Sequence, residues 1–142
     1  MKQIILLFAC LFALQGLAKA DDDRAITVDQ LPQKAQEFIQ KYFPKNEISL
    51  AKMEKDFWEK KYEVVFVNGE KAEFLKDGSW EKVDCKYSTG IVPQAIKDYV
   101  SKHYPEAKIL KIERDSKTYE VKLNNQLELE FNKAFQLIDI DN

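Results

Sequence analysis

The chain has 142 residues, a length that fits one ordinary domain or two very small ones. Its formal net charge is −2, from 22 basic and 24 acidic residues, which excludes a general electrostatic attraction to nucleic acid or to an anionic membrane surface. Behind the N-terminal apolar run, no segment of the sequence reaches membrane-spanning length. We therefore expect no nucleic-acid partner and no membrane span in the mature chain.

The first 20 residues have the pattern of a secretory signal peptide, which is removed from the mature protein. Lys2 supplies a short positive start, residues 4–14 form an apolar run, and Ala18-Lys19-Ala20 is a small-x-small cleavage sequence. The run is too short for a membrane-spanning helix. The sequence therefore predicts cleavage near Ala20 and a mature protein that is periplasmic or secreted.

The two cysteines bear on the compartment and on how the chain is anchored. Cys10 follows Leu7-Phe8-Ala9, a loose match to a lipobox, so lipid attachment at Cys10 is an alternative to simple cleavage. After cleavage only Cys85 is left, which excludes an internal disulfide. An exported chain without disulfides fits the periplasm better than the extracellular space, where small domains are often disulfide-rich. We expect Cys85 itself to be a small buried apolar residue.

The mature sequence repeats one pattern twice. Each copy opens with apolar residues spaced as one face of a helix, between prolines that suit a helix start and a helix end. The first copy runs from Leu31-Pro32 to Tyr42-Phe43-Pro44, and the second from Val92-Pro93 to His103-Tyr104-Pro105. We therefore predict a helix over each segment, with the His103 side chain packed and hydrogen-bonded on the buried face.

Behind each helix the apolar period changes to the two-residue alternation of a strand. Hairpin turns are expected at Asn68-Gly69, at Asp77-Gly78 and at Asn124-Asn125. The strands predicted around these turns are residues 48–54, 62–67, 71–75 and 79–84 in the first copy and residues 109–113, 119–123, 127–132 and 135–140 in the second.

These elements predict an α+β protein made of two tandem helix-plus-four-strand repeats, which form a curved antiparallel sheet with both helices on one face. The predicted organisation is a signal peptide at 1–20, a first repeat at 21–85, a linker at 86–91 and a second repeat at 92–142. The linker is too short for the repeats to tumble independently. Since a helix covers only one face of a sheet, the other face is solvated, packed against the other repeat, or used for binding.

Short motifs in the first copy carry a family likeness. The first is the predicted helix from Leu31-Pro32 to Phe43-Pro44. After it in the sequence come the motifs Tyr62-Glu63-Val64, Asn68-Gly69, Glu73-Phe74, Asp77-Gly78-Ser79-Trp80 and Val83-Asp84. This pattern resembles the PepSY-like family, whose fold is described as that of the beta-lactamase-inhibitor protein. The resemblance implies an exported protein. The inhibitor clamps an enzyme with a concave sheet surface, and PepSY domains also occur in propeptides of thermolysin-type proteases, where inhibition is suspected.

The second copy departs from the family pattern. It has Ala134-Phe135-Gln136-Leu137 where the first copy has its Asp-Gly-x-Trp turn. No contact residue of the inhibitor can be matched in this sequence. Inhibition of a beta-lactamase is therefore not carried over.

We find no catalytic, cofactor or metal-binding motif in the sequence. His103 and Cys85 are the only histidine and the only mature cysteine, too few for a typical zinc site and without a nucleophile–base pattern. Asp21-Asp22-Asp23 lacks the spaced ligands and the turn glycine of a calcium loop. With four glycines in all, the chain has no glycine-rich phosphate loop. The sequence thus predicts a protein that is not an enzyme and that carries no cofactor.

Two groups of residues are not required by the predicted fold and are therefore candidates for binding. Phe57 and Trp58 fall in a four-residue insertion of the first copy, at a hairpin where the second copy has Asp115-Ser116-Lys117. Exposed aromatic residues at a tip are candidate hot spots for binding, and the alternative is that both rings fold back over the sheet edge. The second group faces the open side of the sheet, unless it packs against the other copy: Val65, Val67, Leu75 and Tyr87. Trp80 is expected to be structural.

Together these features predict an exported module that binds another, unknown exported protein. Under this hypothesis, binding could also inhibit the activity of that partner. A second hypothesis is small-molecule or glycan binding in an aromatic-lined groove on the same face. A third is a structural role through self-association, with Cys85 as one route.

Overall fold

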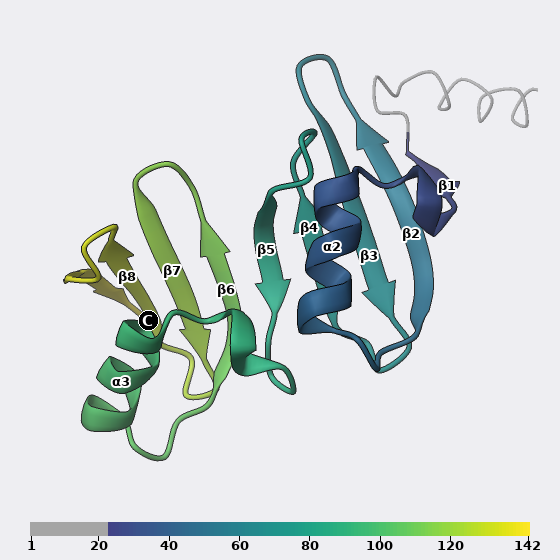
Figure 1. The fold of residues 1–142 in the computed structure, drawn as a ribbon. Coiled ribbons are helices and arrows are strands. Elements are labelled where there is room, and N and C mark those ends of the chain that lie inside the picture. Colours follow the sequence, from purple (N-terminus) through teal and green to yellow (C-terminus); the bar gives the residue numbers. More distant parts are fainter. Residues whose placement is uncertain (1–22) are drawn as a thin grey trace, which may run out of the picture.

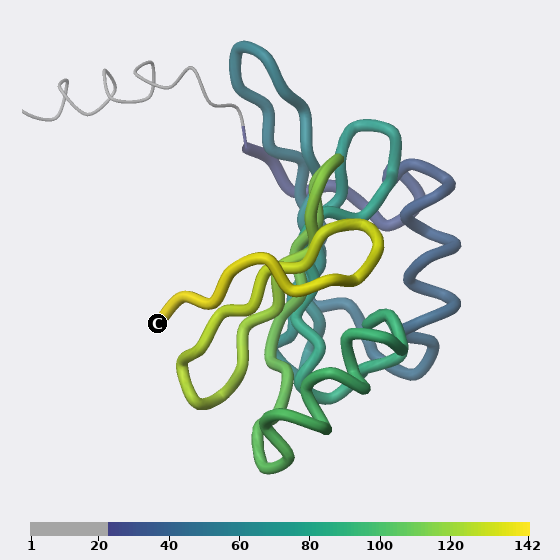
Figure 2. The backbone as a smooth tube through the Cα atoms, turned by 90° about the vertical axis from the view of Figure 1, so that its left-hand side faces the viewer, coloured from purple at the N-terminus to yellow at the C-terminus, as the bar shows by residue number. Residues whose placement is uncertain are grey.

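The computed structural model describes residues 23–142, so the predicted signal peptide and Cys10 lie outside the described residues. These residues form one antiparallel sheet of nine strands in chain order, β1 to β9 (Figure 1). Two α-helices lie on the same side of this sheet (Figure 2). The predicted α+β class and antiparallel sheet are therefore confirmed.

The element bounds agree closely with the sequence-based prediction. The helices are α2 (Gln33–Tyr42) and α3 (Gln94–His103), preceded by the short 3-10 helices η1 (Val28–Gln30) and η2 (Thr89–Ile91). The strands are β1 (Arg24–Ile26), β2 (Ile48–Lys55), β3 (Lys60–Phe66), β4 (Lys71–Phe74), β5 (Trp80–Asp84), β6 (Ile109–Arg114), β7 (Thr118–Leu123), β8 (Glu128–Asn132) and β9 (Leu137–Asp141). β1 was not predicted, because three residues are too few to show a period.

Each helix covers the sheet with its apolar stripe. Helix α2 buries Ala35, Phe38 and Ile39, and α3 buries Ile96 and Val100. Each large apolar side chain that is removed from water contributes about 1.5–3 kcal/mol. A proline precedes each helix, where its missing N–H is not needed.

The prediction for His103 is wrong. His103 is the last residue of α3, and its side chain is exposed. The imidazole stacks on the Tyr99 ring at a centroid distance of 4.2 Å. The helical period predicts His103 on the apolar face, but its ring stays in solvent against Tyr99, whereas Tyr42 at the matching end of α2 packs against the core.

One hydrophobic core runs through the described residues, and its aromatic contacts tie each helix to the sheet. Phe38 meets Phe74 edge-on at 5.4 Å, and Tyr99 meets Phe131 in the same way at 5.4 Å. Pairs of this kind contribute about 0.5–1.5 kcal/mol beyond the area that they bury.

Strands β5 and β6 join the first and second halves of the chain. Val83 pairs with Ile112, and both side chains are fully buried. Across the same junction the Arg114 guanidinium lies 4.0 Å from the centre of the Trp80 ring, and its Nε donates a hydrogen bond to the Trp80 carbonyl oxygen at 2.9 Å. Trp80 is buried, as predicted for a structural residue.

The buried carboxylate of Glu70 holds the chain where it leaves β5. Its Oε2 accepts a hydrogen bond from the Tyr87 amide at 3.0 Å, and its Oε1 accepts one from Asn68 Nδ2 at 3.2 Å. Glu70 is the buried charged residue of the described chain. These bonds supply the partners that a buried carboxylate needs.

The hairpin turns are longer by one residue than predicted. The Phe66 amide bonds to the Glu70 carbonyl at 2.8 Å, which leaves three residues in the loop, and the last of them, Gly69, has a φ of 94°. This is the three-residue loop that ends in a left-handed residue. Val67 therefore belongs to a turn and not to the open sheet face.

Two side-chain-bearing residues occupy left-handed positions in the second half. Gln126 has a φ of 76° in the β7–β8 turn, and Phe135 has a φ of 64° in the β8–β9 turn. The last strand therefore starts at Leu137 and not at residue 135 as predicted. A side chain in this region costs about 1–2 kcal/mol relative to the ordinary conformation.

Replacing Gln126 with glycine is expected to raise the free energy of unfolding by about 0.5–1 kcal/mol, since glycine removes the left-handed strain at the expense of a more flexible unfolded chain. Urea denaturation followed by circular dichroism measures the change. Lys122→Gly, at an exposed position of β7, is the control and should lower the stability. A loss of stability with Gln126→Gly would contradict the assignment of strain to this turn.

Candidate functional site

The tip of the β2–β3 hairpin presents two aromatic rings to solvent. The turn is Asp56-Phe57-Trp58-Glu59, and the Asp56 amide donates to the Glu59 carbonyl at 3.0 Å. Asp56 Oδ1 accepts hydrogen bonds from the amides of Trp58, at 3.1 Å, and Glu59, at 2.9 Å. An aspartate side chain that bonds to the backbone ahead of it closes a turn in this way.

Phe57 and Trp58 are exposed by 79% and 89%. Their ring centroids are 6.2 Å apart, so the two rings contact each other at the tip. They do not fold back over the sheet edge. The structure therefore has a paired aromatic feature at the end of a defined turn, and we call it the hairpin tip (Phe57 and Trp58).

The corresponding β6–β7 turn shows that the aromatic rings are not needed for the turn. Asp115 Oδ1 accepts from the amides of Lys117, at 2.7 Å, and Thr118, at 2.8 Å, and the Asp115 amide donates to the Thr118 carbonyl at 3.0 Å. The turn geometry is the same, but Ser116 and Lys117 occupy the central positions.

The extra residues of the first half lie in the strands and not in the turn, which corrects the expectation that Phe57 and Trp58 belong to the insertion. β2 and β3 have eight and seven residues, whereas β6 and β7 have six each. The longer strands carry the hairpin tip outward beyond the neighbouring turns (Figure 1).

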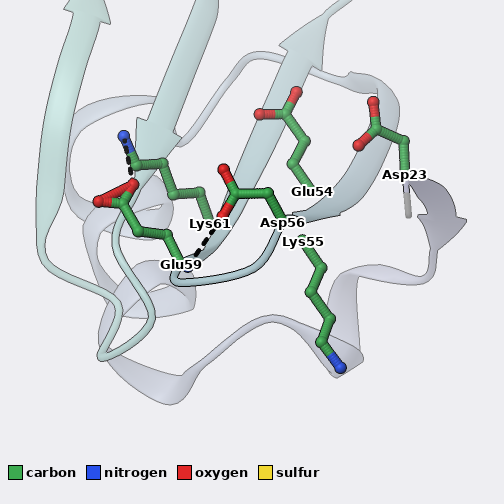
Figure 3. A pocket seen from close by; sticks show the side chains of 6 residues that line it. All are labelled: Asp23, Glu54, Lys55, Asp56, Glu59 and Lys61. Carbon is green, nitrogen blue, oxygen red and sulfur yellow. Dashed lines mark hydrogen bonds and ion pairs between the residues drawn. The ribbon is translucent and has the colours of Figure 1, made fainter. Parts of the chain in front are cut away.

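A charged cleft of about 280 Å³ lies beside this hairpin (Figure 3). Lys61 bonds to Glu59 at 3.4 Å and to Glu81 at 3.0 Å, and the hydrogen bond to Glu81 is the main reason that the pKa of Lys61 is raised. The lining contains neither ring of the hairpin tip: Asp23, Glu54, Lys55, Asp56, Glu59 and Lys61. The cleft is thus not the aromatic-lined groove that the small-ligand hypothesis expects.

The structure separates two members of the second predicted group, Val65 and Leu75, along the sheet. Val65 is half-buried in β3 beside Lys71, whereas Leu75 follows Phe74, which pairs with Tyr62. Leu75 therefore lies about four residues from Val65 along the strand direction, which corresponds to roughly 13 Å. Val67 and Tyr87 are exposed beyond the ends of β3 and β5. Since Val67, Leu75 and Tyr87 are exposed, they are also not buried against the other half.

The face of the sheet opposite the helices carries a row of charged residues in register. Strand by strand from β2 to β9, the paired residues are Lys52, Glu63, Glu73, Lys82, Glu113, Glu120, Glu130 and Asp139. We call this set the acidic row, since six of its members are acids. In the sequence most of these acids appear only as glutamates at alternate positions of the predicted strands. Only the strand register aligns them.

The acidic row borders an open cleft of about 330 Å³, which is lined by residues from β3 to β8. Partial burial, followed by the charge of Glu128, Glu113 and Glu130, raises the pKa of Glu120. Partial burial also raises the pKa of Glu73, although Lys82 acts in the opposite direction. Like charges directly opposite each other on neighbouring strands are unfavourable.

Glu120→Gln is expected to raise the free energy of unfolding at neutral pH by about 0.2–1 kcal/mol, the range of one cross-strand charge interaction. A carboxyl whose folded pKa is raised destabilises the fold when ionised, and this effect disappears as the pH falls through the folded pKa toward the ordinary value of 4.5. The advantage of the variant should therefore shrink as the pH is lowered, as measured by thermal unfolding. An equal advantage at all pH values, or the same profile for the exposed Glu106→Gln, would contradict this explanation.

The Cys85 thiol is fully buried, as predicted. Burial, together with the charges of Glu70 and Asp84, raises its pKa to about 12. A thiol in this setting is protonated and unreactive. The arrangement gives no support to self-association through a Cys85 disulfide.

Within residues 23–142, no group of three or more His, Cys, Asp or Glu side chains is arranged to hold a metal ion. None of the helices in this part of the chain is long and apolar enough to span a membrane.

Comparisons with known proteins identify a family and several solved relatives. The sequence model of a family described as "Putative beta-lactamase-inhibitor-like, PepSY-like" matches residues 60–139. No functionally curated protein is detectably similar to the chain.

Three of the similar solved structures come from Bacteroides species. A "putative calcium-regulated periplasmic protein" from Bacteroides thetaiotaomicron is 56% identical, with a TM-score of 0.81 over 85% of this chain and 98% of that chain. A "putative periplasmic protein from DUF2874 family" from Bacteroides vulgatus is 55% identical, with a TM-score of 0.79 over 87% of this chain and 100% of that chain. Another Bacteroides vulgatus protein, described as a "putative periplasmic protein of unknown function", is 33% identical, with a TM-score of 0.78 over 85% of this chain and 100% of that chain.

Proposed function

Since this chain belongs to the PepSY-like, beta-lactamase-inhibitor-like family and is similar to proteins described as periplasmic, we propose that it is an exported, non-catalytic module that binds another exported protein. Export would follow cleavage near Ala20.

The exposure of the hairpin tip is the observation that carries this proposal. Phe57 and Trp58 are exposed by 79% and 89%, although the same turn forms in β6–β7 with Ser116 and Lys117. A buried aromatic side chain removes about 150–250 Å² from water, so two adjacent rings provide a large driving force for association. Buried tryptophan anchors dominate many protein interfaces, and Trp58 is of this type.

A non-catalytic role is supported by the environments of Cys85 and His103, the residues best suited to catalysis by their chemistry. The Cys85 thiol is buried with a pKa raised to about 12, and the exposed His103 ring contacts Tyr99. A nucleophilic thiol must be activated toward its thiolate form, and burial keeps the Cys85 thiol protonated.

We also propose that the chain is an internal duplication, with repeats at 21–85 and 92–142 joined by 86–91. Helix α2 is followed by β2 to β5, and α3 by β6 to β9. The left-handed turn positions correspond, with Gly69 matching Gln126 and Gly78 matching Phe135. In such a duplication, the β6–β7 turn would have stayed polar, whereas the β2–β3 turn would have become specialised for binding.

The test is affinity capture from the native envelope fraction, followed by binding measurements with the purified partner. Phe57→Ala and Trp58→Ala are each expected to weaken binding by about 2 kcal/mol or more if they are hot spots. Lys117→Ala, at the matching position of the β6–β7 turn, is the control and should bind normally. Unchanged stability of the Trp58→Ala variant would show that the loss concerns binding and not folding, because exposed positions rarely affect stability.

Tryptophan fluorescence adds a readout that is local to the hairpin tip. Trp58 is exposed and Trp80 is buried, so shielding of the emission from acrylamide on binding reports on Trp58. Binding that leaves the accessibility of Trp58 unchanged would contradict the assignment of the interface. If the partner is an enzyme, its activity with and without the bound protein shows whether binding inhibits it.

A further inference from the structure

We propose that the outer edge of β9 docks an extended, basic segment of another protein, which adds to the sheet as a further strand with lysine or arginine side chains alternating with apolar ones. β9 ends the strand order at the side of the sheet opposite to β1 and β2, so this site is separate from the hairpin tip (Figure 1).

The backbone of β9 (Leu137–Asp141) offers hydrogen bonds along one edge. In the described residues it pairs with β8 alone. Every second residue of an edge strand directs its N–H and C=O groups away from the neighbouring strand. The other edge strand, β1, has three residues, whereas β9 has five. An added strand bonds to such an edge through the main chain, and the alternating side chains set its specificity.

One face of this edge is apolar. Ile140 pairs with the fully buried Leu129, so it faces the helix side of the sheet, yet it is 46% exposed. Ile138, at the irregularity in the pairing of β9 with β8, is 52% exposed. Apolar side chains on an added strand would cover these isoleucines, since side chains directly across neighbouring strands contact each other.

The other face of this edge is acidic. Asp139 pairs with Glu130 and Asp141 pairs with Glu128. The ion pairs of the open face lie on β2 to β6, where Lys52 bonds to Glu63, Lys61 to Glu81 and Lys82 to Glu113. Within the described residues, none of these lysines bonds to the acids of β8 and β9.

The charges along β9 favour a basic strand over a second copy of this chain as the binding partner. A second copy of this chain that paired through β9 would bring aspartates of one copy beside aspartates of the other, and like charges on neighbouring strands repel. Acidic residues at an edge prevent self-association in this way. A strand with basic side chains at alternate positions instead places each cation beside the carboxylates of Asp139 and Asp141.

The test uses the full mature chain and a capped seven-residue peptide of alternating lysine and valine, labelled for fluorescence anisotropy. We expect saturable binding that weakens with added salt. A peptide of alternating glutamate and valine should bind at least about ten-fold more weakly, since attractive cross-strand pairs are replaced by repulsive ones. Hydrogen exchange should slow at the amides of β9 when the lysine–valine peptide is bound.

Two variants and one modified peptide decide the outcome. Asp139→Asn/Asp141→Asn should weaken binding of the lysine–valine peptide, whereas Trp58→Ala should leave it unchanged, so this site and the hairpin tip succeed or fail separately. A peptide methylated at alternate backbone nitrogens keeps its charge but loses strand pairing, and it should bind weakly. Equal binding of the lysine and glutamate peptides, or of the methylated and unmethylated ones, would overturn the proposal.

Discussion

Gly78→Ala is expected to lower the free energy of unfolding by about 2–5 kcal/mol, from the combined penalties of left-handed strain and overpacking. Gly78 has a φ of 92° in the β4–β5 turn. An added Cβ would lie 2.8 Å from the Lys34 Cβ, 3.0 Å from the Ala35 amide nitrogen and 3.0 Å from the Pro32 Cβ. The backbone nitrogen cannot swing aside, so the turn or the start of α2 must move.

Gly69→Ala is the matched control for this prediction. Gly69 has a φ of 94°, but an added Cβ would meet no atom within 4 Å. Its loss of stability should therefore be limited to the backbone strain of about 1–2 kcal/mol. Urea denaturation of both variants separates strain from close packing. Equal losses for the two variants would show that the turn yields and that the contact with α2 does not restrict residue 78.

Phe131→Ala is expected to lower the free energy of unfolding by about 3–5 kcal/mol, the usual range for removing a buried phenylalanine ring. Phe131 is fully buried in β8 and meets the Tyr99 ring of α3 at 5.4 Å. Ile138→Ala, at an exposed position of the neighbouring strand, should have little effect and serves as the control.

The same variant shows whether the two halves unfold together. Both tryptophans, Trp58 and Trp80, lie in the first half, whereas Phe131 lies in the second. Because β5 pairs with β6 and one core spans the described residues, tryptophan fluorescence and far-UV circular dichroism should shift to the same new midpoint. A fluorescence transition that stays at the wild-type midpoint would mean that the halves unfold independently.

Local patterns were sufficient to predict most of the elements. The spacing of Ala35, Phe38 and Ile39 predicts α2, and all three side chains are buried in it. The alternation around Val64 and Val121 predicts β3 and β7, and both valines are fully buried. These predictions succeed because the apolar spacing of a helix or strand is visible in a short stretch of sequence, whatever the element packs against in the fold.

The turns were predicted less well, because the loop length depends on backbone hydrogen bonds that residue types do not specify. Gly69 marks its turn correctly, but the bond from Phe66 to Glu70 makes the loop one residue longer and moves Val67 into it. No glycine or asparagine marks the left-handed position of Phe135, so the start of β9 was predicted too early. There the Phe135 ring stacks on Tyr119 at 5.5 Å, a contact that only the folded hairpins allow.

By itself, the sequence determined the helices, the alternating strands, the burial of Cys85 and Trp80 and the choice of Phe57 and Trp58 as residues that the repeated pattern does not require. The tertiary structure alone decided that both rings point into solvent, that the acidic row lies in register and that β9 is an edge. The reason is physical: periodicity is a property of neighbouring residues, whereas exposure, register and edge position arise only when segments far apart in the chain pair with each other.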